Sequence, residues 1–303
     1  MIKTNTFLFL FILFSIAAHA QKVDKKLQKE LEALVQNYNG DIGVYVKNLK
    51  NGNTVAINAD TVFPTASIVK IPILIGVMDK MAKDELGYEQ SVVYRDSLLY
   101  AGVDILGSFK QDEKIEIGKL MMLMLTMSDN TASLWLQSLA GTGTRINQIM
   151  DSLNLPNTKV NSRTPGREAI RSKYGWGQTT PREIVLLIEK IYNGQVVDRA
   201  ASDRMLRLLN RNYWDGVSIS QLPPYVTVFS KNGAVDGSRN EVLLVKGKES
   251  LYAFSVFTKN NKDTSWENSN EAWELTRKIS ALLWNYFEPK DTWAPAADAA
   301  KYN

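Results

Sequence analysis

The sequence predicts an α/β fold in which a block of helices is inserted between two groups of strands. One group of strand-like segments lies early in the chain and the other lies near its end. Between them, apolar residues recur at helical spacing over several long segments. The late strands would complete the sheet that the early strands begin. A cleft is expected where the helical block meets the sheet, which is a preferred place for a small-molecule site.

The first elements of this fold are a helix and two strands. Residues 22–37 place leucine and valine on one stripe and predict an amphipathic helix. Strands are predicted at 42–46 and 54–57, with Asn51-Gly52 at the turn between them. The first helix and the last are expected to cover the same face of the sheet.

The rest of the chain supplies the inserted helices, the late strands and the closing helix. Helices of the inserted block are predicted at 67–83, 117–127, 132–139, 144–153 and 182–192, the last after Pro181 at the favoured first position. The late strands are predicted at 226–229, 241–245 and 251–257, and the closing helix at 268–287. In the sequence, the strands of one sheet therefore stand on both sides of the helices.

The folded part is predicted as one domain over residues 21–288. Its sheet part covers about 21–64 and 216–288, and its helical insertion covers about 65–215. Residues 289–303 are rich in Ala, Asp and Pro and are expected to form a loosely ordered tail.

The start of the chain has the pattern of an export signal. Lys3 precedes the apolar stretch 7–17, and an Ala-His-Ala cleavage pattern ends at Ala20. The alternative is a membrane anchor, but the apolar stretch is shorter than the roughly 20 residues that a bilayer requires. We therefore expect residues 1–20 to be removed, leaving Gln21 first in a periplasmic or secreted protein.

Composition excludes some classes of partner. The 303 residues are 45% hydrophobic and 22% charged, which is an ordinary globular composition. The net charge of +4 is small, and we find no dense basic run with interleaved aromatic residues. A nucleic-acid partner is therefore not expected. We expect a monomer that binds a small-molecule substrate.

The mature chain would contain neither histidine nor cysteine, because the one histidine is His19 and the sequence has no cysteine. A Ser-His-Asp triad and a thiolate nucleophile are therefore excluded. A zinc site built from His or Cys is excluded too, and no metal or cofactor is expected. If the protein is a hydrolase, a serine activated by a lysine is the remaining route.

Ser67-Ile68-Val69-Lys70 is the first candidate for such chemistry. Three residues apart at a helix start, Ser67 and Lys70 would share one face. A buried lysine with lowered pKa can accept the proton of a serine hydroxyl. The alternative is a helix-capping serine with a solvated lysine. Lys70 lies within an apolar stretch, where an unpartnered ammonium is costly, and this favours the first interpretation.

Two further short motifs contain polar residues beside apolar segments. Ser128-Asp129-Asn130 is either an ordinary helix start or a second hydroxyl and an amide facing the cleft. Lys231-Asn232-Gly233 follows a predicted strand and is either a simple exit into a turn or a cation and a close backbone approach to a ligand. Each motif alone is weak evidence, because short patterns recur by chance.

Together and in this order, the three motifs resemble the signature elements of class A β-lactamases and penicillin-binding proteins. Pro64-Thr65-Ala66 and Thr179-Thr180-Pro181 agree with this resemblance, which extends from Lys22 to Phe287. It implies a three-layer αβα sandwich of the β-lactamase/transpeptidase type. The sheet would be antiparallel and flanked by helices, with an inserted all-helical subdomain.

The resemblance also implies a role for each catalytic candidate. Ser67 would be the nucleophile that is acylated, and Lys70 its general base or proton relay. Ser128 would pass a proton to the nitrogen of the leaving group.

The substrate-binding roles are implied in the same way. Asn130 would hold the substrate amide, and Lys231 would bind a carboxylate, with Asn232 and Gly233 beside it. The backbone N–H groups of Ser67 and Ala234 would form the oxyanion hole.

The sequence departs from the family pattern at two places. Asn232 stands where the third motif normally has Thr or Ser. Thr164, before Pro165, stands where class A enzymes have the glutamate that activates the deacylating water, and Glu168 is four residues late. Acylation is therefore expected, whereas fast hydrolysis of the acyl-enzyme would require Glu168 to reach the site.

Three functions remain open from the sequence. The first is an exported serine hydrolase that acts on β-lactams. The second is a penicillin-binding-type D-Ala peptidase or esterase that acts on peptidoglycan-like peptides. The third is a domain that binds β-lactams or peptidoglycan and stays acylated without turnover.

Overall fold

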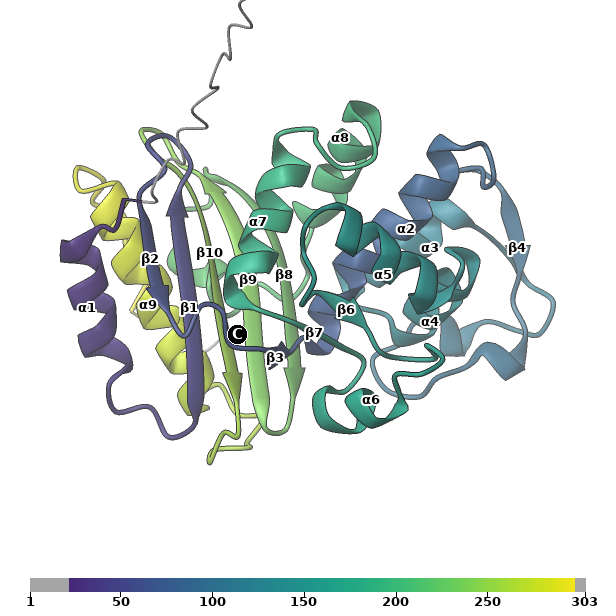
Figure 1. The fold of residues 1–303 in the computed structure, drawn as a ribbon, viewed down its shortest axis with the longest axis horizontal. Helices are drawn as coiled ribbons and strands as arrows, with labels where there is room; N and C mark the ends of the chain where they lie inside the picture. The colour runs from purple at the N-terminus through teal and green to yellow at the C-terminus, as the bar shows by residue number, and fades with distance from the viewer. Residues whose placement is uncertain (1–21, 298–303) are drawn as a thin grey trace, which may run out of the picture.

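The computed structural model describes residues 22–297 and has a five-stranded antiparallel sheet at its centre (Figure 1). The strand order is β2-β1-β10-β9-β8, so the two early strands pair with the late ones through β1 and β10. The strands are β1 (Asp41–Asn48), β2 (Thr54–Ile57), β8 (Thr227–Val235), β9 (Ser238–Lys246) and β10 (Leu251–Lys259). The predicted completion of the sheet by the late strands is confirmed.

One face of the sheet is covered by the first helix and the last, as predicted. The helices α1 (Lys25–Val35) and α9 (Glu271–Phe287) pack together and share a core with this face (Figure 1). Leu31 and Ile279 are fully buried there, which is the usual result of placing an apolar helical stripe against a sheet.

The other face is covered by α7 (Pro181–Tyr192), which packs on β1, β9 and β10. The remaining helical part lies to one side of the sheet (Figure 1). Its helices are α2 (Lys70–Ala82), α3 (Ile117–Met122), α4 (Asn130–Leu139), α5 (Thr142–Ser152), α6 (Glu168–Tyr174) and α8 (Arg199–Leu209). The predicted three-layer αβα sandwich with a helical insertion is confirmed, although α7 belongs to the sheet layer as much as to the insertion.

Short strands outside the main sheet form two further small sheets, which were not predicted. One small sheet pairs β3 (Phe63–Pro64), β7 (Gly177–Thr179) and β6 (Lys159–Val160). A second pairs β4 (Ser91–Val93) and β5 (Lys114–Glu116). Strands of two or three residues are too short to produce a recognisable alternation in sequence.

Two predicted elements end elsewhere than expected. The helix predicted at 117–127 stops at Met122 and continues as one π-helical turn, Leu123–Met127. The strand predicted at 226–229 continues to Val235, so Lys231-Asn232-Gly233 lies within β8 and is not a strand exit. Pairing with β9 extends this strand through residues of low strand propensity.

The ends of the predicted domain are only partly described. The predicted signal peptide lies outside the described residues, as does the end of the predicted tail. In the described part of that tail, the Tyr225 hydroxyl donates to Asp291 Oδ2 at 2.6 Å. Within residues 22–297, no helix is both long enough and apolar enough to cross a bilayer.

Close packing between α2 and α5 holds the helix that begins at Lys70. A Cβ added to Gly76 would lie 2.8 Å from Ile146 Cγ1 and 3.1 Å from Ala140 Cβ. Such distances leave no room for a side chain unless the two helices separate.

Gly76→Val should therefore lower the free energy of unfolding by about 1–3 kcal/mol through overpacking. Urea denaturation measures this as a lower midpoint. Gly87→Val is the matched control, because Gly87 is exposed and the nearest atom to its added Cβ is 3.4 Å away. Equal losses in the two variants would contradict the packing argument.

Candidate active site

Ser67 lies in a 3₁₀ turn, Ala66–Val69, that leads directly into α2. The residue before it, Ala66, has φ of 44°, an unusual value for a residue with a side chain. The turn rests against β8 at Gly233, where an added Cβ would lie 2.5 Å from Thr65 O and 2.7 Å from Ser67 N. Glycine is therefore required at position 233 for the nucleophile turn to reach the strand.

Lys70 is fully buried at the start of α2 and lies among oxygen atoms. Its Nζ is 3.0 Å from each of Ser67 Oγ, Ser128 Oγ and Asn130 Oδ1, and it also donates to the Ser128 carbonyl. An ammonium has only three hydrogens for these four oxygens. A neutral amine could instead accept the Ser67 proton, so the contact to Ser67 suits proton transfer in either direction.

The loop Ser128-Asp129-Asn130 supplies three of the four oxygens. Ser128 has φ of 63°, and this left-handed residue follows the π-helical turn. Asp129 is fully buried, caps α4 by accepting from Ala132 N at 2.7 Å, and accepts from Leu106 N at 3.1 Å. Asp129 therefore holds the loop in place, while its two neighbours face Lys70.

Lys231, on the edge strand β8, is the second fully buried lysine. Its Nζ donates to Asn232 O at 2.9 Å and to Asn232 Oδ1 at 3.2 Å. The amide that replaces the hydroxyl of the family motif therefore contacts the amine expected to bind a carboxylate.

Burial lowers the proton affinity of both lysines, and the charge of Lys231 lowers that of Lys70 further. Burial, followed by the charge of Lys231, holds the pKa of Lys70 well below its usual range, and Asp129 opposes this shift. Burial lowers the pKa of Lys231 to about 7, opposed by the carboxylate of Glu241. Two charged amines close together in a dry site are costly, so one of them tends to be neutral.

Glu241 on β9 is paired with Asn232 across the ladder and was missed from the sequence. Its carboxyl group is 2% exposed and accepts a hydrogen bond from Ser218 N at 3.1 Å, while its Oε1 has no partner among the described residues. Burial raises its pKa to about 7, opposed first by Ser218 and then by the charge of Lys231. Only strand register could have shown this, because Glu241 is ten residues from Lys231.

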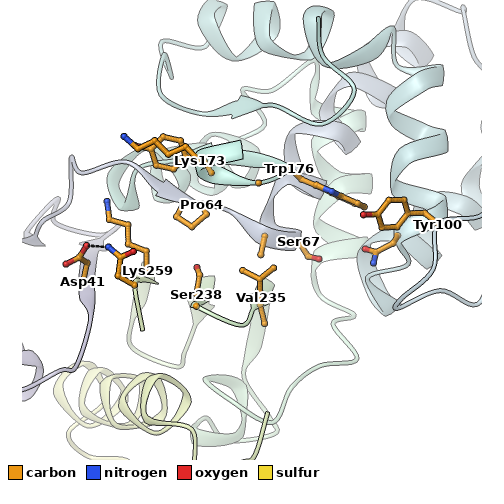
Figure 2. A pocket seen from close by; sticks show the side chains of 16 residues that line it. Asp41, Pro64, Ser67, Tyr100, Lys173, Trp176, Val235, Ser238 and Lys259 are labelled. Atoms are coloured by element: carbon orange, nitrogen blue, oxygen red, sulfur yellow. Dashed lines mark hydrogen bonds between the residues drawn. The ribbon is translucent and has the colours of Figure 1, made fainter. Parts of the chain in front are cut away.

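Ser67 opens into a cleft of about 620 Å³ between the sheet and the helical part (Figure 2). Tyr100 and Trp176 line the cleft, with ring centroids 5.0 Å apart in an edge-to-face arrangement. Asn130 and Ala234 line the cleft too. The Asn130 side chain and the Ala234 backbone, both candidates for substrate contact, therefore lie at the same cleft as the nucleophile.

The two candidates for a deacylating base lie elsewhere. Thr164 is buried, donates to Ser162 O at 2.9 Å and packs against Gly143 at the start of α5. Glu168 is exposed at the start of α6, where its Oε1 accepts from Gly166 N at 3.2 Å. Neither residue lines the cleft. The structure therefore brings Ser67, Lys70, Ser128 and Asn130 together and leaves Glu168 apart from them.

The cleft offers no obvious place for a metal. Within residues 22–297 no group of three His, Cys, Asp or Glu side chains is positioned to hold a metal ion. The chemistry available at the site is that of a serine hydroxyl, two amines and the backbone N–H groups beside them.

The fold and the geometry of Ser67, Lys70 and Ser128 are those of a serine hydrolase that uses a lysine in place of histidine. A model of the beta-lactamase enzyme family matches residues 26–287, and the chain belongs to that family. This finding confirms the resemblance inferred from the motifs, and the fold is that of class A.

Individual relatives are distant but similar over their whole length. The chain is 23% identical to β-lactamase VEB-1 of Pseudomonas aeruginosa over 294 residues, covering 92% of this chain and 96% of VEB-1. The solved structure of PBP-A superposes with a TM-score of 0.79 at 24% identity, over 89% of this chain and 98% of that one. A class A β-lactamase from Mycobacterium abscessus gives 0.76 at 21% identity, over 86% and 99%.

The two lysines predict a bell-shaped pH dependence for acylation by a penicillin. The rate should rise as Lys70 loses its proton, and it should fall above about pH 7 as Lys231 loses the charge that attracts the substrate carboxylate. Glu241→Gln removes an anion that raises the pKa of Lys231, so the falling limb should move to lower pH.

Stopped-flow measurement of the second-order acylation rate constant across pH tests this. A fluorophosphonate without a carboxylate is the control and should show only the rising limb. An unchanged falling limb in Glu241→Gln would show that Glu241 does not act on Lys231.

Proposed function

We propose that this protein is a class A-like serine hydrolase that is acylated at Ser67 by β-lactams and opens the lactam amide. The observation that carries this proposal is the position of the Lys70 amine, buried and 3.0 Å from both Ser67 Oγ and Ser128 Oγ. One amine in contact with both hydroxyls can take a proton from the first and return it through the second.

In the acylation step, neutral Lys70 accepts the proton of Ser67 while Oγ attacks the lactam carbonyl carbon. The N–H groups of Ser67 and Ala234 stabilise the oxyanion of the tetrahedral intermediate. The C–N bond then breaks, and the proton passes from Lys70 through Ser128 to the departing nitrogen. The product is an ester between Ser67 and the opened substrate.

Substrate contacts are assigned to residues around this centre. Lys231, held by Asn232, attracts the substrate carboxylate, and Asn130 donates its amide to the acyl side chain. Tyr100 and Trp176 offer aromatic surface at the cleft wall. The organisation of the N-terminus supports export to the periplasm or medium, where such substrates are met.

Ser67→Ala should abolish a covalent penicillin adduct, because Ser67 contacts Lys70 and lines the cleft, whereas Ser128 contacts Lys70 without being among the residues that line it. Intact mass after mixing should show one equivalent bound to the native protein and none to the variant. Peptide mapping should place the adduct on Ser67. A label on Ser128, or one that survives the substitution, would contradict this assignment.

Turnover of the acyl-enzyme is proposed to be slow. Its hydrolysis needs a base near the ester, and the one carboxylate among the described residues that line the cleft is Asp41, on the far side from Tyr100 (Figure 2). The lack of a nearby carboxylate argues against fast hydrolysis of a β-lactam ester. It thereby favours the second candidate function, a penicillin-binding-type D-Ala peptidase or esterase, which shares the acylation step.

We therefore expect a burst near one equivalent of penicillin followed by slow release, since absence of a general base costs about 10²–10⁴ in rate. Glu168→Gln should leave the release rate unchanged, because Glu168 is exposed and bonded to its own loop. Stopped-flow and single-turnover kinetics measure both quantities. A large loss of release in this variant would make Glu168 the displaced base, and rapid turnover in both proteins would overturn this assignment.

A further inference from the structure

The cleft does not end at the nucleophile. It continues along one edge of the sheet to a charged end formed by Asp41, Lys259, Asn260 and, from α6, Lys173. Figure 2 shows Asp41 and Lys259 together on one side of the cleft, with Ser67 and Tyr100 toward the other. The activity proposed above uses none of these four residues.

Strand order gives the distance from the reacting centre. Ala234 lies on β8, Lys259 on β10 and Asp41 on β1, and these strands are two and three places apart in the sheet. At about 4.8 Å between strands, the charged end begins about 10 Å from Ala234 and reaches about 14 Å. An extended chain of three to four residues spans that length.

The charges at this end are held in position and unpaired. Lys259 Nζ donates to Val62 O at 3.0 Å and lies 4.8 Å from the centroid of the Phe63 ring. Asp41 Oδ2 accepts from Asn260 Nδ2 at 2.8 Å. Among the described residues, neither these two nor Lys173 forms an ion pair.

Each charged group retains capacity for a ligand. Lys259 uses one of its three donors and Asp41 one of its several acceptor positions. Asp41 and Lys259 are also directly paired across β1 and β10, so an acid and a base stand side by side and face the same cleft. A ligand group that bears an ammonium beside a carboxylate would satisfy both.

The polarity of the proposed acylation determines which part of the substrate reaches this end. Lys231 and Ser128 take the leaving nitrogen and its carboxylate, so the acyl part is free to extend along β8 past Ala234 and Val235. Both residues line the cleft on its way to the charged end.

We propose that this end of the cleft is a subsite for an amino-acid head group, an ammonium and a carboxylate on one carbon, at the tip of the substrate's acyl chain. The carboxylate binds Lys259 and Lys173, and the ammonium binds Asp41. This inference rests on the proposed acylation of Ser67 and adds the class of acyl group that the protein prefers. A peptide side chain and a β-lactam side chain can both supply this head group.

Three penicillins separate the contributions of charge and length. One has a D-α-aminoadipoyl side chain, which is zwitterionic at its tip and, when extended, places its terminal carboxylate about 10 Å from the lactam carbonyl carbon. The second is the same compound acetylated on its amino group, and the third has a neutral phenylacetyl side chain. The measured quantity is the second-order rate constant for acylation of Ser67, expressed relative to the phenylacetyl compound within each variant, so that loss of folded protein cancels.

The native protein should be acylated faster by the zwitterionic compound than by the phenylacetyl compound. Acetylation of the amino group should lower this ratio of rate constants about fivefold. Lys259→Met and Asp41→Asn should each reduce the preference by about fivefold, the effect of one exposed ion pair at its upper range. Lys259→Arg should retain it. Lys246→Met, on the exposed far end of β9, is the control and should match the native protein.

Two results would overturn the subsite. One is equal relative rates for the three compounds in the native protein, and the other is a preference that survives both Lys259→Met and Asp41→Asn. A native protein that is acylated by none of the three compounds would instead refute the proposed function itself. A short acidic peptide that ends in the same head group provides a second probe. It should slow acylation of the native protein by the aminoadipoyl compound, and it should not slow acylation of the Asp41→Asn variant.

Discussion

The site depends on the complete burial of one amine. Lys70 is removed from water where the start of α2 meets the loop before α4, and oxygens from three residues replace its hydration. A buried amine without such partners would be strongly destabilising, so the Ser67 turn and the Ser128 loop must both be held close to it. The glycine contact with β8 fixes the turn, and the Asp129 carboxylate fixes the loop. The sheet and the helical part are thereby joined through the same residues that the chemistry would use.

Two lysines in one dry site divide two tasks between them. Activation of Ser67 needs a neutral amine, and attraction of an anionic substrate needs a charged one. Because the charge of Lys231 lowers the pKa of Lys70, protonation of Lys231 favours the neutral form of Lys70. Glu241 lies on the Lys231 side and raises the pKa of that lysine. Asp129 acts in the same direction on Lys70, but burial and Lys231 are the larger effects there.

The sequence predicted those parts of the fold and site that depend on local spacing. Ser67 and Lys70 are three residues apart, and the helix and strand patterns that carry α1, α9 and the late strands are long and regular. Glu241 was not predictable, since its relation to Asn232 exists only through the register of β8 and β9. The left-handed Ser128 was also hidden, because no residue pattern distinguishes a π-helical turn from the end of an α-helix.

The loop around Thr164 shows why a motif position is not a geometric position. In sequence, Glu168 is four residues from the expected glutamate, a distance that a flexible loop could cover. In the structure, Thr164 is locked against Gly143, and Arg167 bonds Asn161 at 2.6 Å and Gln178 at 3.0 Å. These contacts fix both ends of the segment before α6, so Glu168 begins a helix at the surface instead of entering the cleft. Bringing its carboxylate to Ser67 would require breaking the Arg167 hydrogen bonds, and charged-donor hydrogen bonds of this kind contribute about 1.5–3 kcal/mol each. The loop therefore holds Glu168 away from the cleft, and the one carboxylate among the described residues that line the cleft is Asp41.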